Sequence, residues 1–458
     1  MRNRLLGLLF GVFLWVALVL SVIHISSLDL NFYERKYEEL NVAENIGVSN
    51  DDLMKSTHVL LDYLVGKTDS LEVYADFDGV NQEFFNQREK DHMIDVQVLF
   101  VNTIHIRNIS IIGLFLSGAL ILWLNRKKAL DVFILGIKEA SMILGFVFAF
   151  LVTFAVLDFD SFWIYFHKVL FSNDLWLLNP NTDNLILMVP LPFFFSLVSL
   201  ILYRVILGLG LLYTIVYGIE NQGYNHRFLK WFALVTMTID HVGHFLFPDL
   251  IELRIVGRLA FPIFAYLFAL SYRYTSNQKK LLIQVSVAAV LTQILLYFTG
   301  VRELVNIFFL FSLAFLAFYA FDKGKMWVII VLALVAEYFT VDYGLYGLFI
   351  LVLFYAYYGD KKKQLSGYIT ITLIYSFIQF VSLSLYLGLP TLLSQFLEYY
   401  WVYFLQALSI LAVGLLWFYR SEKPMSYQKK SLNVIEKYFF YFYYPIHLAL
   451  LGILRGLL

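Results

Sequence analysis

The sequence contains no cysteine among its 458 residues, and it has few charged residues. The absence of cysteine excludes disulfide bonds, thiolate metal ligands and a cysteine nucleophile. Charged residues make up 15% of the chain, whereas soluble domains average about 25%. The 34 basic and 34 acidic residues balance, so the sequence has no basic surplus that would attract nucleic acid. We therefore expect neither thiol chemistry nor a nucleic-acid partner.

The chain is rich in apolar residues, as it is poor in charged ones. The apolar residues make up 60% of the sequence, above the roughly 45–50% of soluble proteins, and they occur in long runs. This pattern predicts an all-α polytopic membrane protein. The first run, Met1–Ile23, begins with Arg2 and Arg4 and resembles a signal peptide. Its apolar part is long and no clean small-residue cleavage site follows, so we interpret it as a retained anchor.

The first half of the chain, residues 1–220, is expected to be a four-helix membrane domain. Short basic loops are typical of the cytoplasmic side, so we expect the N-terminus in the cytoplasm of a multi-pass cell-membrane protein. Residues 24–107 and 158–190 then lie outside the membrane, with a short helix at Asn50–Leu64 capped by Asn50 or Asp51. The four predicted spans are Leu5–Ile23, Ile109–Leu124, Val132–Leu157 and Leu191–Ile219.

A polar, basic stretch at 221–230 is the best candidate for a cytoplasmic linker between two domains. Beyond it, residues 231–458 are expected to form a second domain of about nine transmembrane helices, which makes about thirteen in all. The nine predicted segments are 231–248, 255–272, 281–299, 307–321, 326–341, 343–358, 367–388, 400–419 and 434–454.

Chemistry in the first half is expected where Asp158–Pro190 mixes interfacial aromatic residues with polar groups. His167 lies in this stretch, and His92 precedes the second span on the same predicted side. Two histidines with carboxylates near enough to orient them suit acyl transfer, with one acting as base and the other stabilising the oxyanion. The alternative is a pair of unrelated interfacial histidines. Four neighbouring residues are candidates for substrate binding: Asp95, Asn173, Asp174 and Trp176.

Three stretches of the first half resemble the Lit family, the integral membrane lipoprotein intramolecular transacylases of Gram-positive bacteria. They are NFYERKYEELNV at 31–42, DHMIDV at 91–96 and FWIYFHKVLFSNDLWLLNPNTDNLI at 162–186. The resemblance implies that an acyl chain moves from the diacylglyceryl group of a lipoprotein's N-terminal cysteine to its α-amino group, which leaves a lyso-form lipoprotein. It implies His92 and His167 as the catalytic residues, bacterial lipoproteins and membrane lipids as partners, and no cofactor.

A second group of polar residues begins inside the first span of the second half. Asp240, His241 and His244 lie within one helical stretch, and Arg254 and Arg258 follow at a spacing that places both on one helix face. His447 lies inside the last span. Ionisable groups within apolar spans face the bundle interior and are functional by default, although a buried network that holds the helices together is the alternative. His241 and His244 have the spacing of two metal ligands, but no third ligand is evident, and we expect no metal.

Most of the second half resembles the TraX family of multi-helix membrane proteins. This family is linked to acetylation of conjugative pilin and is similar to the wider group of membrane acyltransferases. The resemblance is carried by KWFALVTMTIDHVGHFLFP, LRIVGRLAFPIFAYLFALSYRYT and YFFYFYYPIHLALL within residues 225–458. It implies Asp240 and His241 as catalytic residues, with Arg254, Arg258 and His447 in substrate binding. It also implies acetyl-CoA or another acyl donor, although the sequence has no nucleotide-binding loop.

Both resemblances concern acylation at a membrane, so we interpret the chain as a membrane acyltransferase. The competing interpretation is a non-catalytic membrane scaffold or a transporter that uses the same polar residues structurally. A transporter is disfavoured because the sequence shows no internal repeat.

Overall fold

The structure is a computed structural model that describes residues 2–77, 79–248, 250–298, 305–396, 400–420 and 433–457. Its described elements are helices apart from one two-stranded antiparallel sheet. The contacts divide the chain into two compact units, Met1–Val216 and Tyr217–Leu458. Each unit is described below by itself.

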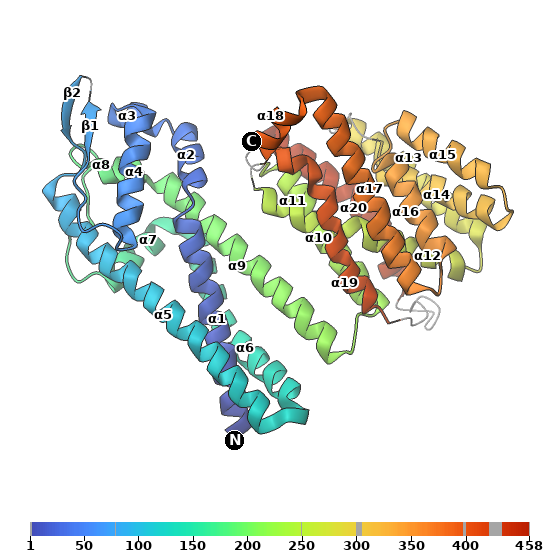
Figure 1. Cartoon of the computed structure of the whole chain (residues 1–458), viewed down its shortest axis with the longest axis horizontal. Coiled ribbons are helices and arrows are strands. Elements are labelled where there is room, and N and C mark those ends of the chain that lie inside the picture. The colour runs from blue at the N-terminus through green and yellow to red at the C-terminus, as the bar shows by residue number, and fades with distance from the viewer. Residues whose placement is uncertain are drawn as a thin grey trace. The chain divides into compact units, whose positions relative to one another are not determined.

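Four long apolar helices form the frame of the first unit, which confirms the predicted four-helix layout (Figure 1). Helix α1 packs against both of the next two long helices. Helix α5 differs most from its predicted span, because it begins at Gln87 rather than Ile109 and continues as one helix of 39 residues. The four helices are α1 (Arg2–Ser27), α5 (Gln87–Asn125), α6 (Ala129–Leu157) and α9 (Leu191–Glu220), with the short turn η1 (Arg126–Lys128) between α5 and α6.

Helices α1 and α6 approach each other closely because small residues line their contact. A Cβ atom added at Gly136 would lie 1.9 Å from the backbone oxygen of Gly7, and one added at Gly11 would lie 2.3 Å from the oxygen of Gly136. Gly7 and Gly11 are one helical turn apart, the small-residue spacing that lets backbones touch in a membrane. This contact holds the N-terminal anchor against the rest of the unit.

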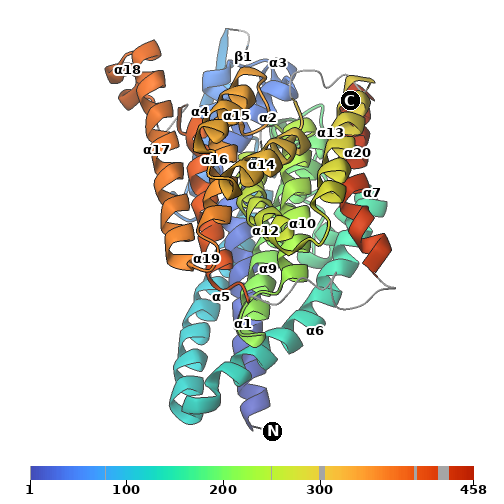
Figure 2. The same cartoon turned by 90° about the vertical axis from the view of Figure 1, so that its right-hand side faces the viewer.

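The remaining elements of the first unit gather at the end of the long helices that is remote from the N-terminus (Figures 1 and 2). The predicted helix Asn50–Leu64 is present, but its cap is Ser49, whose hydroxyl accepts a hydrogen bond from the backbone N–H of Asp52 at 3.0 Å. These elements are α2 (Leu30–Glu39), α3 (Val42–Ile46), α4 (Asn50–Leu64), β1 (Tyr74–Phe77), β2 (Val80–Glu83), α7 (Phe159–Leu170) and α8 (Asn184–Met188).

In the second unit, each of the nine predicted segments coincides with a described helix or with two consecutive ones. Over the whole described chain, seven helices are long and apolar enough to cross a membrane, and five more apolar helices are shorter. The elements are α10 (His226–Phe245), α11 (Ile251–Gly257), α12 (Ala260–Tyr274), α13 (Gln278–Phe298), α14 (Ile307–Asp322), α15 (Met326–Tyr338), α16 (Gly344–Ala356), α17 (Lys361–Leu387), α18 (Leu389–Ser394), η3 (Trp401–Leu411), α19 (Ala412–Trp417) and α20 (Asn433–Leu457).

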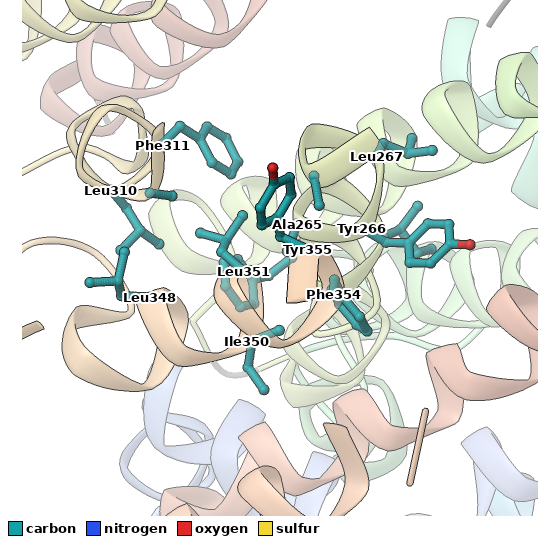
Figure 3. Packing of buried hydrophobic residues seen from close by; sticks show 14 of the residues in the cluster. Ala265, Tyr266, Leu267, Leu310, Phe311, Leu348, Ile350, Leu351, Phe354 and Tyr355 are labelled. Atoms are coloured by element: carbon teal, nitrogen blue, oxygen red, sulfur yellow. The ribbon is translucent and has the colours of Figure 1, made fainter. Parts of the chain in front are cut away.

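The core of the second unit lies where α12, α14 and α16 meet (Figure 3). Helix α16 is apolar around its whole circumference, and Leu348, Ile350 and Leu351 are fully buried in it. A helix that is apolar on every side is stable only at the centre of a bundle or in lipid. Helix α16 contains no charged residue and no histidine, so these side chains are carried by the helices and turns around it.

Candidate active sites

The two histidines of the first unit lie against the same aromatic ring. The centre of the His92 ring is 5.4 Å from that of Phe171, and the centre of the His167 ring is 5.8 Å from it. Both imidazoles are almost completely buried. They are near enough that a proton on one would repel a proton on the other. Tertiary packing therefore brings together two residues that are 75 positions apart in the sequence.

An aromatic cage surrounds His167 and fixes its orientation. The ring stacks on Trp176 with a centroid distance of 4.9 Å and lies edge-on to Trp163 at 4.4 Å. Its Nδ1 atom is 2.8 Å from the backbone oxygen of Trp163. A carbonyl can only accept, so Nδ1 carries the proton and donates it, and Nε2 keeps the lone pair. Burial lowers the pKa of His167 below its ordinary value, which favours this neutral form.

The structure corrects the expectation that carboxylates orient the histidines. Within the described residues, the imidazole of His167 makes one hydrogen bond, to a backbone carbonyl, and the buried Nδ1 of His92 has no partner. Asp95 accepts instead from the side-chain amide of Asn173 at 2.8 Å. Each imidazole therefore has a nitrogen atom that makes no hydrogen bond to the described residues.

The loop that carries Trp176 is tied down by residues of α5. Asn173 bonds to Asp95, as described above. Arg88 donates to the backbone oxygens of Asp174 and Leu177 at 2.9 and 3.2 Å. The carboxylate of Asp174 is exposed, so this residue contributes its carbonyl group to the structure. Three of the predicted substrate-binding residues thus have a positioning role: they hold the loop that places Trp176 against His167. They are Asp95, Asn173 and Asp174.

Glu89 is a positioning residue that sequence reasoning did not single out. It is 1% exposed, and its carboxylate accepts hydrogen bonds from the backbone N–H groups of Asn86 and Leu185. Asn86 also donates to Asp183 at 2.8 Å, so the first turn of α5 holds the end of the loop. The signal was present in the sequence, because Asn86 and Glu89 have the spacing of a capping box.

In the second unit, Asp240 is enclosed by the two arginines of the following segment. One Nη atom of Arg258 lies 2.8 and 3.0 Å from the two carboxylate oxygens, and Arg254 lies 3.2 Å from one of them. Helix α11 comes close enough for this because Gly257 faces Asp240, where an added Cβ would lie 2.2 Å from the aspartate Cβ. Both carboxylate oxygens contact arginine, so the geometry supports a structural role for Asp240 in holding the arginines.

His241 pairs with the histidine of the last helix. Its Nδ1 atom is 2.7 Å from Nε2 of His447, whose own Nδ1 is 2.8 Å from the backbone oxygen of Tyr443. The carbonyl requires a donor, so His447 Nδ1 is protonated, Nε2 accepts, and His241 Nδ1 donates. This series of two hydrogen bonds leaves the lone pair of His241 on its Nε2 atom. Residues 206 positions apart thus form an oriented dyad.

A polar cavity of about 470 Å³ lies beside these groups. Of the residues predicted from sequence, Arg254 and Arg258 line it, together with His244. Asp240, His241 and His447 are not among its lining residues. The predicted site therefore separates into an arginine cavity and a neighbouring histidine pair. Across the described part of the chain, no group of three or more histidine, aspartate or glutamate side chains is arranged to hold a metal ion.

The fold defines an all-α, multi-pass membrane protein. Residues 225–455, half of the chain, match the sequence model of the TraX protein family, and the chain belongs to that family. Residues 8–194 match the family described as lipoprotein intramolecular transacylase Lit. The chain thus joins a Lit part to a TraX part, as the sequence motifs predicted. Both matches support a bacterial, multi-pass membrane protein of acyltransferase type.

Two solved structures and one further relative each match part of the chain. The lipoprotein intramolecular transacylase Lit of Bacillus cereus is 21% identical, with a TM-score of 0.40, and the match covers 48% of this chain and 98% of that chain. A variant of the same protein with one histidine replaced by arginine is 20% identical, with a TM-score of 0.38 over 48% of this chain and 93% of that chain. An uncharacterized protein of Rickettsia prowazekii (strain Madrid E) is 33% identical over 76 residues, which is 17% of this chain and 30% of the relative.

Proposed function

We propose that the first unit moves an acyl chain within a bacterial lipoprotein, from an ester of the diacylglyceryl group to the α-amino group of the N-terminal cysteine. The observation that carries this proposal is the pair of buried imidazoles against Phe171, each with a nitrogen atom that makes no hydrogen bond within the described part of the chain. An intramolecular shift needs a base for the amine and a donor for the oxyanion, and it needs no second substrate.

In the proposed mechanism, His167 is the general base. Its Nε2 lone pair takes a proton as the amine nitrogen attacks the ester carbonyl, and the Nδ1–H bond to Trp163 stabilises the imidazolium that forms. His92 donates an N–H group to the oxyanion of the tetrahedral intermediate. The C–O bond of the ester then breaks, the proton passes from His167 to the leaving alkoxide, and an amide and a free hydroxyl result.

Mass spectrometry of a reporter lipoprotein tests this proposal. Cells with the full-length protein should give the lyso, N-acylated N-terminus, whereas His92→Ala and His167→Ala variants should leave the diacylglyceryl form. His105→Ala is the matched control, because His105 is an exposed histidine on the same helix as His92. If the His167→Ala variant converts the reporter to the lyso, N-acylated form as fully as the wild type does, the proposal is contradicted.

For the second unit we propose acyl transfer to an acceptor other than the lipoprotein amino group on which the first unit acts. This proposal is supported by the His241–His447 dyad, whose hydrogen-bond chain leaves one lone pair on His241. The lipids and proteins of cells that carry His241→Gln are compared with those of wild-type cells by mass spectrometry. Loss of one acylated product at unchanged protein abundance is expected. A scaffold predicts instead that products stay the same while binding partners change.

A further inference from the structure

The second unit contains an apolar cavity in addition to the arginine cavity. It has a volume of about 610 Å³ and lies between α13, α14 and α15. Ligand pockets of about 300–1,000 Å³ are the usual range, so the space is large enough for a substantial part of a ligand. Its wall is mainly hydrocarbon, provided by residues such as Leu282, Val305, Phe309, Leu313, Val335 and Phe339.

A single backbone segment separates the two cavities. Val341 lines the apolar cavity, whereas the next two residues, Asp342 and Tyr343, line the arginine cavity. Val341 forms a bridge with Val305, and the N–H of Asp342 donates to the oxygen of Val305 at 2.9 Å. These residues lie in a turn, in which the N–H of Gly344 donates to the oxygen of Val341 at 2.7 Å, and consecutive Cα atoms are about 3.8 Å apart. Consecutive residues thus line different cavities, so the two cavities are neighbours at Val341–Asp342.

The arginine cavity has groups for both signs of charge. Arg254 contacts Asp240 through Nη1, while its Nε and Nη2 atoms have no partner among the described residues. This free edge is a fork that fits two oxygens of a phosphate. The carboxylate of Asp342 lines the same cavity and suits an ammonium group. Gln379 adds a buried side-chain oxygen that has no hydrogen-bond partner in the described part of the chain.

We propose that the two cavities together bind one phospholipid with a zwitterionic head group. Its phosphate contacts Arg254, its ammonium contacts Asp342, and one acyl chain passes over the Val341 segment into the apolar cavity. Given the acyl transfer proposed for this unit, on which the inference rests, this lipid is the acyl donor in place of a soluble thioester. Its ester C–O bond breaks as the acyl group passes to the acceptor, the acceptor's proton goes to the leaving oxygen, and a lysophospholipid is released.

Photolabelling of the full-length protein tests the inference. The protein is placed in phosphatidylglycerol vesicles that contain phosphatidylethanolamine with a diazirine at the end of one acyl chain. Labels are expected within residues 305–316 and 335–341. Leu313→Trp and the less buried Leu316→Trp, which fill the apolar cavity, should each lower this labelling about tenfold, and Arg254→Gln should do the same. Asp342→Asn should reduce labelling by the phosphatidylethanolamine probe but not by a phosphatidylglycerol probe.

The matched control is Leu291→Trp, which adds the same side chain on the exposed face of α13 and should leave labelling unchanged. Labelling that spreads equally over exposed helix faces, or that persists in both cavity-filling variants, overturns the inference. Because labelling needs no turnover, it remains measurable if the unit proves inactive. Acyl transfer from acetyl-CoA without cavity labelling would overturn the lipid donor while leaving acyl transfer intact.

Discussion

The Nδ1 atom of His241 lies 2.7 Å from Nε2 of His447, and the stacked rings have a centroid distance of 5.0 Å. This contact makes a prediction about protonation. We expect nitrogen NMR of the histidine-labelled protein to show His241 with its proton on Nδ1. In His447→Leu the acceptor is lost, so the proton should shift towards Nε2. His244→Leu, a change at an exposed neighbour, should leave the His241 signal in place.

The first unit should work at a pH below the ordinary titration range of histidine. Burial lowers the pKa of His167, so its base form persists below pH 6.5, and the acid limb of the pH–rate profile should have its midpoint below that value. The unfolded chain binds this proton more readily, so the contribution of His167 to the free energy of unfolding should be fully present above pH 6.5 and be lost as the pH falls towards the lowered pKa of the folded state. Conversion of a reporter lipoprotein at a series of pH values measures the limb. A midpoint above 6.5 would contradict the assignment of His167 as the base.

Replacing Asp240 should destabilise the second unit strongly. Asp240→Asn leaves Arg254 and Arg258 without their buried counter-charge, and breaking such a group costs about 3–5 kcal/mol. Thermal denaturation of the purified protein measures the loss. Lys363→Gln is the control, because it removes an exposed ion pair with Asp360 in the same unit and should change stability by at most about 1 kcal/mol. If Asp240→Asn were as stable as the wild type, the two arginines would not need the aspartate as a counter-charge.

A larger side chain at the contact between α1 and α6 should separate these helices. Gly11→Leu places atoms where the backbone oxygen of Gly136 already lies, so we expect a loss of at least about 1–3 kcal/mol, measured by thermal denaturation. Gly210→Leu is the matched control, since nothing lies within 4 Å of a Cβ at that position on α9. Equal stability of the two variants would show that the close contact is not required.

The positions of the apolar helices followed from the sequence. A membrane span needs about 20 consecutive apolar residues, and this requirement is local, so α6 and α9 lie almost where their predicted segments lie. Local signals failed at helix ends. The cap of α4 is Ser49 and not Asn50, and α5 continues far beyond its apolar part. The candidate residues were likewise recognisable as types, because histidine and arginine are rare in apolar surroundings.

Only the tertiary structure decided which of these residues meet. His92 and His167 approach Phe171 because loop and helix contacts such as Glu89 with Leu185 hold the loop on α5. The adjacent residues Asp240 and His241 face different partners, arginine for one and His447 for the other. Hydropathy and spacing record which face of a helix is apolar, but the choice of partner depends on how whole helices pack. That choice is made by contacts between residues far apart in the chain, and no local pattern contains it.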